Sequence, residues 1–460
     1  MFSTTDTIVA IATPPGHGGI GVVRLSGACA HEVVRQLTGR AADFAPRHAT
    51  FVRIVGESPA EAGRHESIAG PAIDQAIVTY FPAPASYTGD DVVEVSAHGS
   101  PVVLRSIVAA AIAAGARLAE PGEFTLRAFL NGRIDLMQAE AVADLIDAAT
   151  PLQARAAFDQ LQGTLTRAIA EIDTALFDLI ARLEASVDFP EEGYHFVDER
   201  ELVATLDDLV ERTDRLLADA SRGRLVREGL QIAIVGKPNV GKSSVFNALA
   251  GAARAIVASE PGTTRDLVTE VVDIHGLRAT LVDTAGLRHT SDAVEAEGVG
   301  RAKHAQEVAD LTLLVLDRSQ PLDEDDRREL DINVTNKRLI VENKIDLSCA
   351  WGSRPGISDV QVSARTGDGI ETLRGAIASA LEFEPLSDRP AISNIRHVAL
   401  VCRARDAMLR ARQAFVAGWS SEEFLLADLG DARAALEEIT GKRVTEDLLA
   451  HIFERFCVGK

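Results

Sequence analysis

The sequence predicts a multidomain protein: an N-terminal α/β domain, an all-α helical domain, and a second α/β domain with a phosphate-binding loop inserted into the helical one. Extended and helical patterns alternate over residues 1–118. Apolar residues recur with a period of about 3.6 over 119–222 and again over 384–460, as in helices. Residues 223–383 begin with a strand, a glycine-rich loop and a helix. Because the ends of a self-contained domain can lie close together, we predict that 223–383 interrupts a single helical domain.

The composition is that of an ordinary globular protein with an acidic balance. The 460 residues are 46% hydrophobic and 25% charged, and the net charge is −21. This charge argues against sequence-independent wrapping of nucleic acid, although a local basic patch can still contact RNA. Cys29, Cys349, Cys402 and Cys457 show no C-x-x-C spacing, which favours a reducing compartment. With neither a signal peptide nor an apolar run of membrane length, we expect a cytoplasmic protein that does not enter a membrane.

The first domain alternates strand-like and helical runs. The strands that we expect cover residues 7–12, 20–25, 49–55, 76–81 and 92–95. A helix is expected over 101–114, because Ser100 can cap it, Pro101 suits its first turn and Gly115 follows its end. The glycine-rich run at 16–21 is not directly followed by a helix, as a dinucleotide-binding loop would be. A tight turn between two strands is the favoured interpretation.

Two features of the helical segments leave alternatives open. Arg396, Arg403 and Arg410 recur every seven residues, with Arg405 and Arg412 beside them, and form a basic stripe on one helix. A solvated face is favoured over an RNA site. Near the end, Cys457 lies in F-C-V-G-K, which fails as a prenylation box. By itself this cysteine suits a small buried hydrophobe better than a nucleophile.

The strongest motif is the loop that opens the inserted domain. Residues 236–243 read G-K-P-N-V-G-K-S, between a strand at 231–235 and a helix from 243. In this setting backbone N–H groups and the helix dipole bind phosphate oxygens. Lys242 can then reach the β- and γ-phosphates, and the Ser243 hydroxyl can bind Mg²⁺.

Three further motifs follow in the order of a P-loop GTPase. D-T-A-G at 283–286 follows a strand and places a carboxylate where Mg²⁺ is held. N-K-I-D at 343–346 also follows a strand, and Asp346 can accept hydrogen bonds from both guanine N1–H and the 2-amino group, which adenine does not offer. Ser363 and Ala364 resemble the supporting guanine loop, and Thr264 lies where a second Mg²⁺ hydroxyl belongs. The motifs together indicate GTP.

The predicted nucleotide site contains residues from all of these loops. The residues that we expect to contact GTP are Asn239, Val240, Gly241, Lys242, Ser243, Ser244, Ala258, Ser259, Glu260, Pro261, Gly262, Thr263, Thr264, Asp283, Thr284, Ala285, Gly286, Asn343, Lys344, Asp346, Ser363 and Ala364. One position departs from the Ras-like pattern: Leu287 stands where such enzymes have the glutamine that orients the attacking water. A leucine cannot do so, and another group must.

Over essentially its whole length the chain resembles the MnmE (TrmE) family of tRNA uridine-modification GTPases. The residues that carry the resemblance are the runs at 6–10, 12–16, 121–124, 127–131 and 135–136 and the F-C-V-G-K run at 456–460, in which Val458 replaces the usual isoleucine. His289 replaces an acidic residue that is common in the family. The resemblance implies a homodimer formed by the N-terminal domain and a formyl-tetrahydrofolate site at Arg24, Glu94, Arg133 and Lys460. Physically, two guanidinium groups suit the glutamate carboxylates of a folate, and a carboxylate suits the pterin N–H groups.

The resemblance also implies a reaction and a partner. Family members act with a flavin-containing MnmG-type protein to modify carbon 5 of the wobble uridine of certain tRNAs, giving an aminomethyl or carboxymethylaminomethyl type of group. Cys457 matches a cysteine that matters for this modification, so a functional role is now favoured for it.

Potassium is the last implication of the resemblance. Family members use K⁺ where other GTPases use an arginine finger, and Asn239 matches its side-chain ligand. Further K⁺ ligands would be backbone carbonyls at Ala258, Glu260 and Thr263, and Glu295 matches a glutamate that orders the attacking water. With Lys242 and Cys457, Asn239 and Glu295 are the predicted catalytic residues, and Ser243 and Thr264 are the predicted Mg²⁺ ligands.

Two other classes stay open on sequence grounds. A ribosome-assembly GTPase of the Era or EngA kind shares the GTP motifs and the leucine substitution, but carries an RNA-binding domain after the GTPase domain. A nucleotide-gated scaffold without enzymatic chemistry on tRNA is the third possibility.

Overall fold

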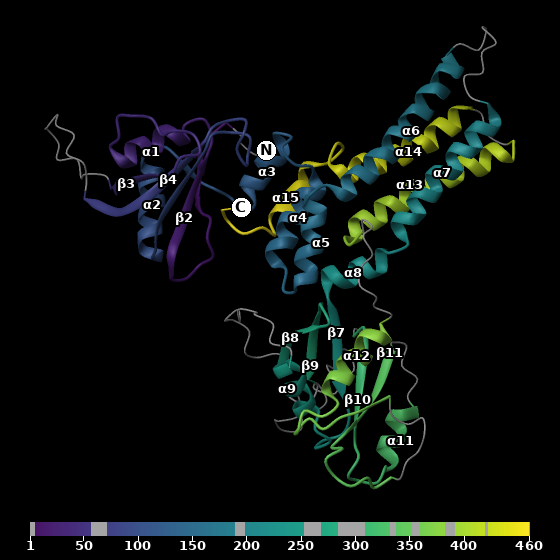
Figure 1. Ribbon diagram of the computed structural model, residues 1–460. Helices are drawn as coiled ribbons and strands as arrows, with labels where there is room; N and C mark the ends of the chain where they lie inside the picture. Colours follow the sequence, from purple (N-terminus) through teal and green to yellow (C-terminus); the bar gives the residue numbers. More distant parts are fainter. Residues whose placement is uncertain are drawn as a thin grey trace, which may run out of the picture. The chain divides into compact units, whose positions relative to one another are not determined.

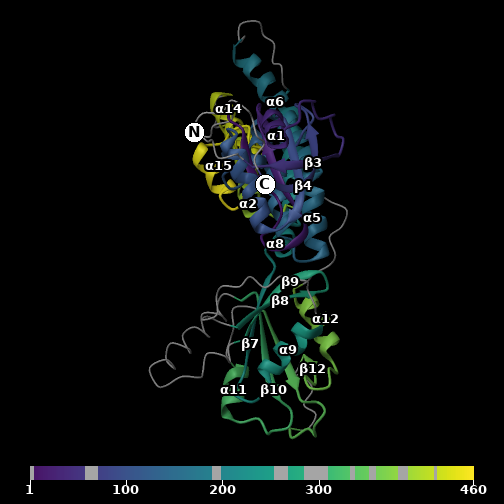
Figure 2. The same cartoon turned by 90° about the vertical axis from the view of Figure 1, so that its left-hand side faces the viewer.

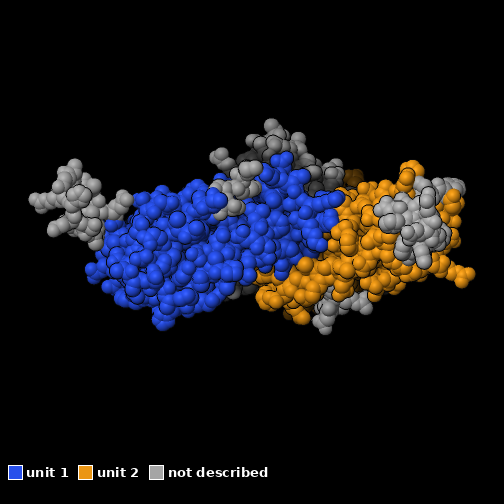
Figure 3. Space-filling view, turned by 90° about the horizontal axis from the view of Figure 1, so that it is seen from above, with its two compact units in different colours: residues 1–143, 437–460 blue, residues 144–436 orange. Residues whose placement is uncertain are grey.

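The computed structural model describes residues 5–56, 71–188, 198–252, 268–283, 309–331, 337–351, 359–381, 392–418 and 422–459. The chain divides into two compact units, one made of residues 1–143 and 437–460 and the other of residues 144–436 (Figure 3). This division cuts through helices α4 (Leu136–Asp147) and α14 (Glu422–Thr440). The two units therefore do not coincide with the predicted domains, and the boundaries of those domains stay predictions.

The first unit is built on a mixed sheet with strand order β3-β4-β5-β2-β1-β6. The strands are β1 (Ile8–Ile11), β2 (Gly18–Ser26), β3 (Thr50–Val55), β4 (Ala72–Phe81), β5 (Val92–Gly99) and β6 (Arg117–Leu118). The five predicted strands are all present. The glycine-rich run begins in the connection between β1 and β2, which pair antiparallel, and its residues 18–21 are the first residues of β2. The turn between two strands is therefore confirmed for the start of the run.

Helices α1 (Ala30–Thr38) and α2 (Pro101–Ala113) pack on one face of this sheet (Figure 1). The α2 helix confirms the helix predicted over 101–114. Gly21 lets α2 approach β2, because a Cβ added there would lie 2.5 Å from Leu104 Cδ1. On the other face Ile20, Phe51 and Ile77 are 71%, 69% and 45% exposed, and Phe51 and Ile77 are directly opposite each other on β3 and β4.

A small helical core links segments that are far apart in the sequence. Helices α3 (Glu123–Leu130), α4 and α15 (Glu446–Phe453) bury Leu126, Leu136 and Phe453 together (Figure 1). The added Cβ of Gly122, whose φ is 68°, would lie 2.8 Å from the Phe453 carbonyl oxygen. Residues on both sides of the second α/β domain thus share one core, as an inserted domain requires.

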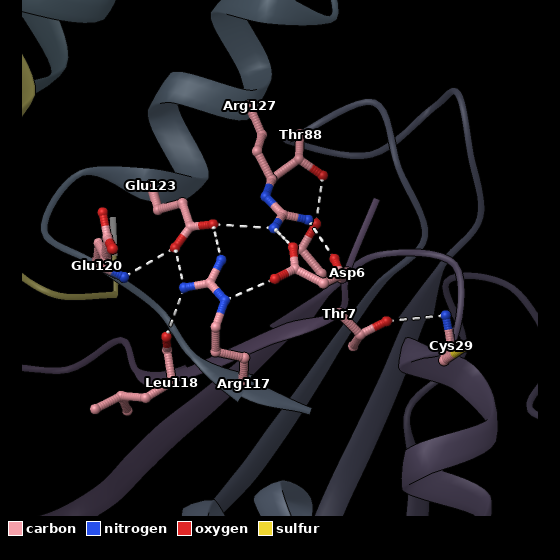
Figure 4. A network of polar contacts seen from close by, with 10 residues as sticks. Asp6, Thr7, Cys29, Thr88, Arg117, Leu118, Glu120, Glu123 and Arg127 are labelled. Atoms are coloured by element: carbon pink, nitrogen blue, oxygen red, sulfur yellow. Dashed lines mark hydrogen bonds and ion pairs between the residues drawn. The ribbon is translucent and has the colours of Figure 1, made fainter. Parts of the chain in front are cut away.

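A partly buried ionic network ties α3 to the sheet (Figure 4). Arg127, 1% exposed, donates to Asp6 Oδ1 at 2.6 Å and to Glu123 Oε1 at 2.9 Å. Arg117 of β6 donates to the same two carboxylates, each at 2.6 Å. The Arg117 hydrogen bond is the largest influence on Asp6, and the pKa of that carboxyl is lowered to about 2. The Asp6 carboxylate therefore remains charged at all ordinary pH values.

In the second unit, helices α5 (Pro151–Leu161), α6 (Thr164–Asp188), α7 (Glu199–Leu217), α8 (Ala220–Glu228), α13 (Ile395–Val416) and α14 confirm the predicted helical regions. The arginine stripe lies on α13. Arg405 contacts Asp214 of α7 at 3.3 Å, Arg412 contacts Asp207 of α7, and Arg410 contacts Asp428 of α14 at 3.1 Å. These three arginines therefore connect α13 to α7 and α14 through ion pairs. Neither the solvated face nor the RNA site considered from the sequence included this role.

The second α/β domain has the strand order β12-β11-β10-β7-β9-β8. Its strands are β7 (Leu230–Val235), β8 (Val268–Ile274), β9 (Leu277–Asp283), β10 (Leu311–Asp317), β11 (Lys337–Asn343) and β12 (Val360–Gln361). All neighbours are parallel except β8 and β9. Helices α9 (Lys242–Ala252) and α12 (Ile370–Ala380) lie on one face and α11 (Glu324–Asp331) on the other (Figure 2). Both faces are covered, which is why β7 and β10 are mostly apolar. The predicted α/β, helical and inserted α/β architecture is confirmed.

Candidate nucleotide-binding site

The carboxyl ends of five parallel strands meet at one edge of the second sheet. The loops that follow β7, β11 and β12 and the last residue of β9 carry the predicted GTP motifs. In open parallel sheets this edge is where ligands bind. We call residues 236–243 the phosphate loop and residues 343–346 the guanine loop.

The phosphate loop is shaped by two glycines with positive φ. Gly236, at φ 139°, would place a Cβ 2.4 Å from the Val315 carbonyl oxygen, and Gly241, at φ 97°, 2.3 Å from Asn343 Nδ2. Any side chain would therefore force the loop away from β10 or from the guanine loop. Lys242 begins α9, is 6% exposed, and donates from Nζ to the Lys237 carbonyl oxygen at 2.6 Å. Its ammonium is held inside the loop that would receive the phosphates.

Ser243 and Asp283 lie together, as the motifs predict. The Ser243 hydroxyl donates to Asp283 Oδ2 at 2.7 Å, and Asp283 is 5% exposed. A hydroxyl and a carboxylate are hard oxygen ligands of the kind that Mg²⁺ prefers, so this pair fits the metal. Among the described residues no group of three or more His, Cys, Asp or Glu side chains could hold a metal ion.

Asn343 joins three loops rather than pointing into the site. It is 2% exposed, donates from Nδ2 to the Val240 carbonyl oxygen at 2.9 Å, and accepts from Ala364 N–H at 3.1 Å. The next residue, Lys344, donates from Nζ to the Asn239 carbonyl oxygen at 2.9 Å. The guanine loop thereby holds the phosphate loop in two places. Asn239 itself is exposed and has φ 64°.

Asp346 is fixed by two neighbours in the loop after β12. Its Oδ1 accepts from the Ser363 hydroxyl at 2.7 Å, and its Oδ2 lies 3.2 Å from Arg365 Nε. The Ser363 hydrogen bond, with a smaller contribution from Arg365, lowers the pKa of Asp346. The carboxylate is therefore charged at neutral pH and able to accept from the guanine edge. Ser363 was predicted only as part of a supporting loop, and its contact gives it a defined role.

Two polar residues of the site were missed from the sequence. Lys237 of the phosphate loop pairs with Asp326 of α11 at 2.9 Å and also with Asp323. Asp317, the last residue of β10, accepts from Lys344 Nζ at 2.6 Å. For Asp317 the sequence offered one signal, an aspartate at the end of an apolar run that lies between the phosphate-loop motif and the guanine-loop motif. It was not used because β10 itself was not predicted.

Several predicted site residues lie outside the described part of the chain. They are Ala258, Ser259, Glu260, Pro261, Gly262, Thr263, Thr264, Thr284, Ala285, Gly286, Leu287, His289, Glu295 and Lys460. The K⁺ carbonyl ligands, the second Mg²⁺ hydroxyl and the water-ordering glutamate therefore stay predictions.

The proposed folate residues are partly brought together in the first unit. Arg24 and Glu94 are opposite each other on β2 and β5 and form an ion pair, with Nε to Oε1 at 2.9 Å. The rings of Tyr87 and Phe124 lie 5.6 and 5.8 Å from the Arg24 guanidinium carbon. The sequence argument gave Arg24 and Glu94 different parts of the ligand, whereas here each partly neutralises the other. A ligand carboxylate would have to share Arg24 with Glu94.

The C-terminal segment lies beside this pair. Arg24 Nη1 donates to the Gly459 carbonyl oxygen at 3.5 Å, and Gly122 N–H donates to the Cys457 carbonyl oxygen at 3.4 Å. Cys457 is exposed, so the alternative of a buried hydrophobe is wrong. Arg133 lies near Gly89 and also lines an open cavity of about 580 Å³ whose other lining residues include Lys442 and Phe129.

The chain matches two family models and full-length relatives. The models are "GTP-binding protein TrmE N-terminus" over residues 7–133 and "MnmE helical domain" over residues 136–457. The tRNA modification GTPase MnmE of Nitrosospira multiformis is 42% identical over 466 residues, covering all of both chains. That of Aquifex aeolicus is 40% identical over 457 residues, covering 99% of this chain and all of the relative.

A solved structure of Era from Aquifex aeolicus is 25% identical and covers 39% of this chain and 67% of its own, with a TM-score of 0.26. So low a score carries no conclusion. None of the helices that the structure describes is long and apolar enough to cross a membrane. The two models together span the helical and N-terminal segments on both sides of the GTP motifs, and this sets the ribosome-assembly alternative aside. The chain belongs to the MnmE (TrmE) family of tRNA modification GTPases.

Proposed function

We propose that this chain binds and hydrolyses GTP and that it uses the reaction in tRNA modification. The observation that carries the proposal is the strand edge at which Lys242, the Ser243–Asp283 pair and the Ser363–Asp346 pair gather. Lys242 supplies a cation for the phosphates, the Ser243–Asp283 pair supplies oxygen ligands for Mg²⁺, and Asp346 supplies an acceptor for the guanine edge. Membership of the family supports the same reading.

The phosphoryl transfer would rest on positioning and charge. The backbone N–H groups of residues 239–244 and the start of α9 would hold the phosphate oxygens. Mg²⁺, when bound at Ser243, neutralises charge that develops on the β- and γ-phosphate oxygens. Thr264 would complete its protein ligands, and Glu295 would order the attacking water that Leu287 cannot orient.

Asn239 is the residue that we propose for potassium. It is exposed, lies inside the phosphate loop and has a left-handed φ of 64°. An amide oxygen there suits a monovalent cation beside the phosphates, and backbone carbonyls from Ala258, Glu260 and Thr263 would add to it. A cation at this position supplies the charge that an arginine finger gives other GTPases, about 10³–10⁵ in rate.

A second site, for a formyl-tetrahydrofolate, is proposed around Arg24, Glu94, Arg133 and Lys460. The Arg24–Glu94 pair with two aromatic rings suits a flat heterocycle that carries N–H donors and a carboxylate tail. The exposed Cys457 near this pair would act in the modification itself.

The partners would be a second copy of the chain, an MnmG-type FAD protein and tRNA, in the cytoplasm. The exposed apolar face formed by Ile20, Phe51 and Ile77 supports a homodimer through the first sheet, because such a patch marks an interaction surface. Phe51→Glu should then raise the fraction of monomer in sedimentation experiments, while Phe158→Glu, at an exposed aromatic of α5, should not. The product would be a wobble uridine modified at carbon 5.

Two measurements test the proposal. Nucleoside analysis of tRNA from a strain without this gene should lack the modified wobble uridine, and an unchanged nucleoside profile would refute the tRNA part. GTP hydrolysis should be faster in K⁺ than in Na⁺ at equal ionic strength, and Asn239→Ala should remove that difference while GDP still binds. A wild-type rate that does not distinguish the two cations would refute the potassium part.

A further inference from the structure

We propose that Asp317 is a positioning residue of the nucleotide site, which fixes the Lys344 ammonium so that it joins the phosphate loop to the guanine loop. The inference rests on the proposed GTP site and adds a residue that belongs to none of its motifs.

The Asp317 carboxylate is held on both oxygens. Oδ2 accepts from Lys344 Nζ at 2.6 Å, and Oδ1 accepts from the Ser319 N–H at 2.8 Å and from the Ser319 hydroxyl at 2.7 Å. The side chain is 11% exposed. Burial acts to raise the pKa of Asp317, but the hydrogen bonds from Lys344 and Ser319 outweigh it and the pKa lies below its usual value. A charged, rigid acceptor therefore faces Lys344.

The backbone of Asp317 is fixed as well. Its carbonyl oxygen accepts from Trp351 Nε1 at 3.1 Å, and the N–H of the following residue, Arg318, donates to the Asn343 carbonyl oxygen at 3.0 Å. Strand β10, which ends at Asp317, lies between β7 and β11 in the sheet. Asp317 thus stands between the strand that precedes the phosphate loop and the strand that ends in the guanine loop.

Lys344 depends on such a partner. Its backbone has φ 66°, a region in which non-glycine residues persist only where their surroundings hold them. The same ammonium donates to the carbonyl oxygen of Asn239, which also has a positive φ. One charge-assisted contact therefore steadies two strained residues, one in each loop.

The substitution Asp317→Asn tests the negative charge of the Asp317 side chain separately from its size. Asparagine keeps the volume of the side chain and can still accept from Ser319, but it no longer attracts the ammonium. We expect the affinity for GDP to fall about tenfold, the typical loss for a hydrogen bond to a charged group. The KM for GTP should rise in parallel, while kcat at saturating GTP should change less than about threefold, because bound phosphates restore the geometry of the loop.

A double-mutant cycle decides whether Asp317 acts through Lys344. Fluorescent GDP would be titrated against the full chain with Asp317→Asn, Lys344→Met and both changes together. We expect Asp317→Asn to weaken GDP binding by less than about twofold once Lys344 is methionine. An equal loss in both backgrounds would overturn the proposal, because it would mean that Asp317 only supports the Ser319 turn.

Two controls complete the experiment. Asp310 precedes the opposite end of β10 and accepts from Gln231 N–H at 2.9 Å, so Asp310→Asn should leave GDP affinity unchanged. Ser319→Ala removes one anchor of the Asp317 carboxylate without removing its charge and should weaken GDP binding about two- to threefold. If Asp346→Asn does not weaken GDP binding, the proposed GTP site is wrong. If Asp346→Asn weakens GDP binding but neither Asp317→Asn nor Ser319→Ala does, the GTP site stands and only the positioning role of Asp317 is wrong.

Discussion

Asp346→Asn should change the base preference of the nucleotide site. In the wild type one carboxylate oxygen accepts from Ser363 at 2.7 Å, and the carboxylate can also accept the two guanine donors. An asparagine has a single acceptor oxygen, which Ser363 and guanine would have to share. Its amide N–H₂ would face the guanine 2-amino group, and one donor of the base would be left unpaired.

The expected loss is about 10- to 100-fold in affinity for GDP, the usual effect of an unpaired polar group in a binding site. Xanthine has a carbonyl where guanine has the 2-amino group, so the variant should bind XDP better than the wild type does. Competition of GDP, XDP and ADP against fluorescent GDP measures all three affinities. Asp368→Asn, an exposed aspartate in the loop after β12, is the matched control and should have no effect. Equal affinity of the wild type for ADP and GDP would refute the reasoning.

Four further predictions follow from the contacts described above. Ser363→Ala should weaken GDP binding several-fold more than Arg365→Ala, because Arg365 is 80% exposed and surface ion pairs contribute little. Arg127→Met should lower the free energy of unfolding by about 2–4 kcal/mol in denaturant titrations, since Asp6 and Glu123 would keep Arg117 as their partner. Asp6→Asn should lower the free energy of unfolding at pH 6 by about 1–2 kcal/mol after allowance for solvent screening, measured as a lower thermal midpoint. The pKa of Asp6 in the folded chain is about 2, below its usual value of 3.8. The difference in stability between wild type and variant should therefore shrink as the pH falls from about 4 to 2. Cys457→Ser should abolish wobble-uridine modification and leave GTP hydrolysis near normal, and a parallel loss of both would make the cysteine structural.

The order of elements could be predicted from sequence because local patterns set it. Strand–loop–helix at 231–250 needs only an apolar run, two glycines and a helical period, and all of these are local. The turn between β1 and β2 was predicted because no helix follows the glycine-rich run directly, whereas the antiparallel pairing of the two strands was not predicted. Strand β10 was not predicted, although it is the central strand of its sheet between β7 and β11. Its apolar run carries no motif, and length alone does not separate a buried strand from a buried helix.

Contacts between motifs were beyond prediction because they depend on which loops become neighbours. Nothing in the sequence says that Asn343, a motif residue, binds the Val240 carbonyl rather than a ligand. The arginine stripe shows the same limit. Its period correctly placed the cations on one helix, but the partners Asp207 and Asp214 lie about 200 residues earlier on α7 and the partner Asp428 lies on the next helix, α14. For the same reason the sequence did not reveal that Arg24 and Glu94 pair with each other.

The order of the strands in the second sheet determines what shape of ligand the edge can hold. Ser363 follows β12, Asp346 follows β11, the phosphate loop follows β7, and Asp283 ends β9. Neighbouring strands are about 4.8 Å apart, so the guanine loop and Asp283 are separated by about 14 Å along the edge. A ligand that contacts both must be long, with hydrogen-bond donors at one end and anionic oxygens at the other. A base or a free phosphate would meet only half of these groups. The guanine loop contacts the phosphate loop directly through Asn343 and Lys344, and Asp317, the charged residue at the end of the intervening strand β10, holds the Lys344 ammonium.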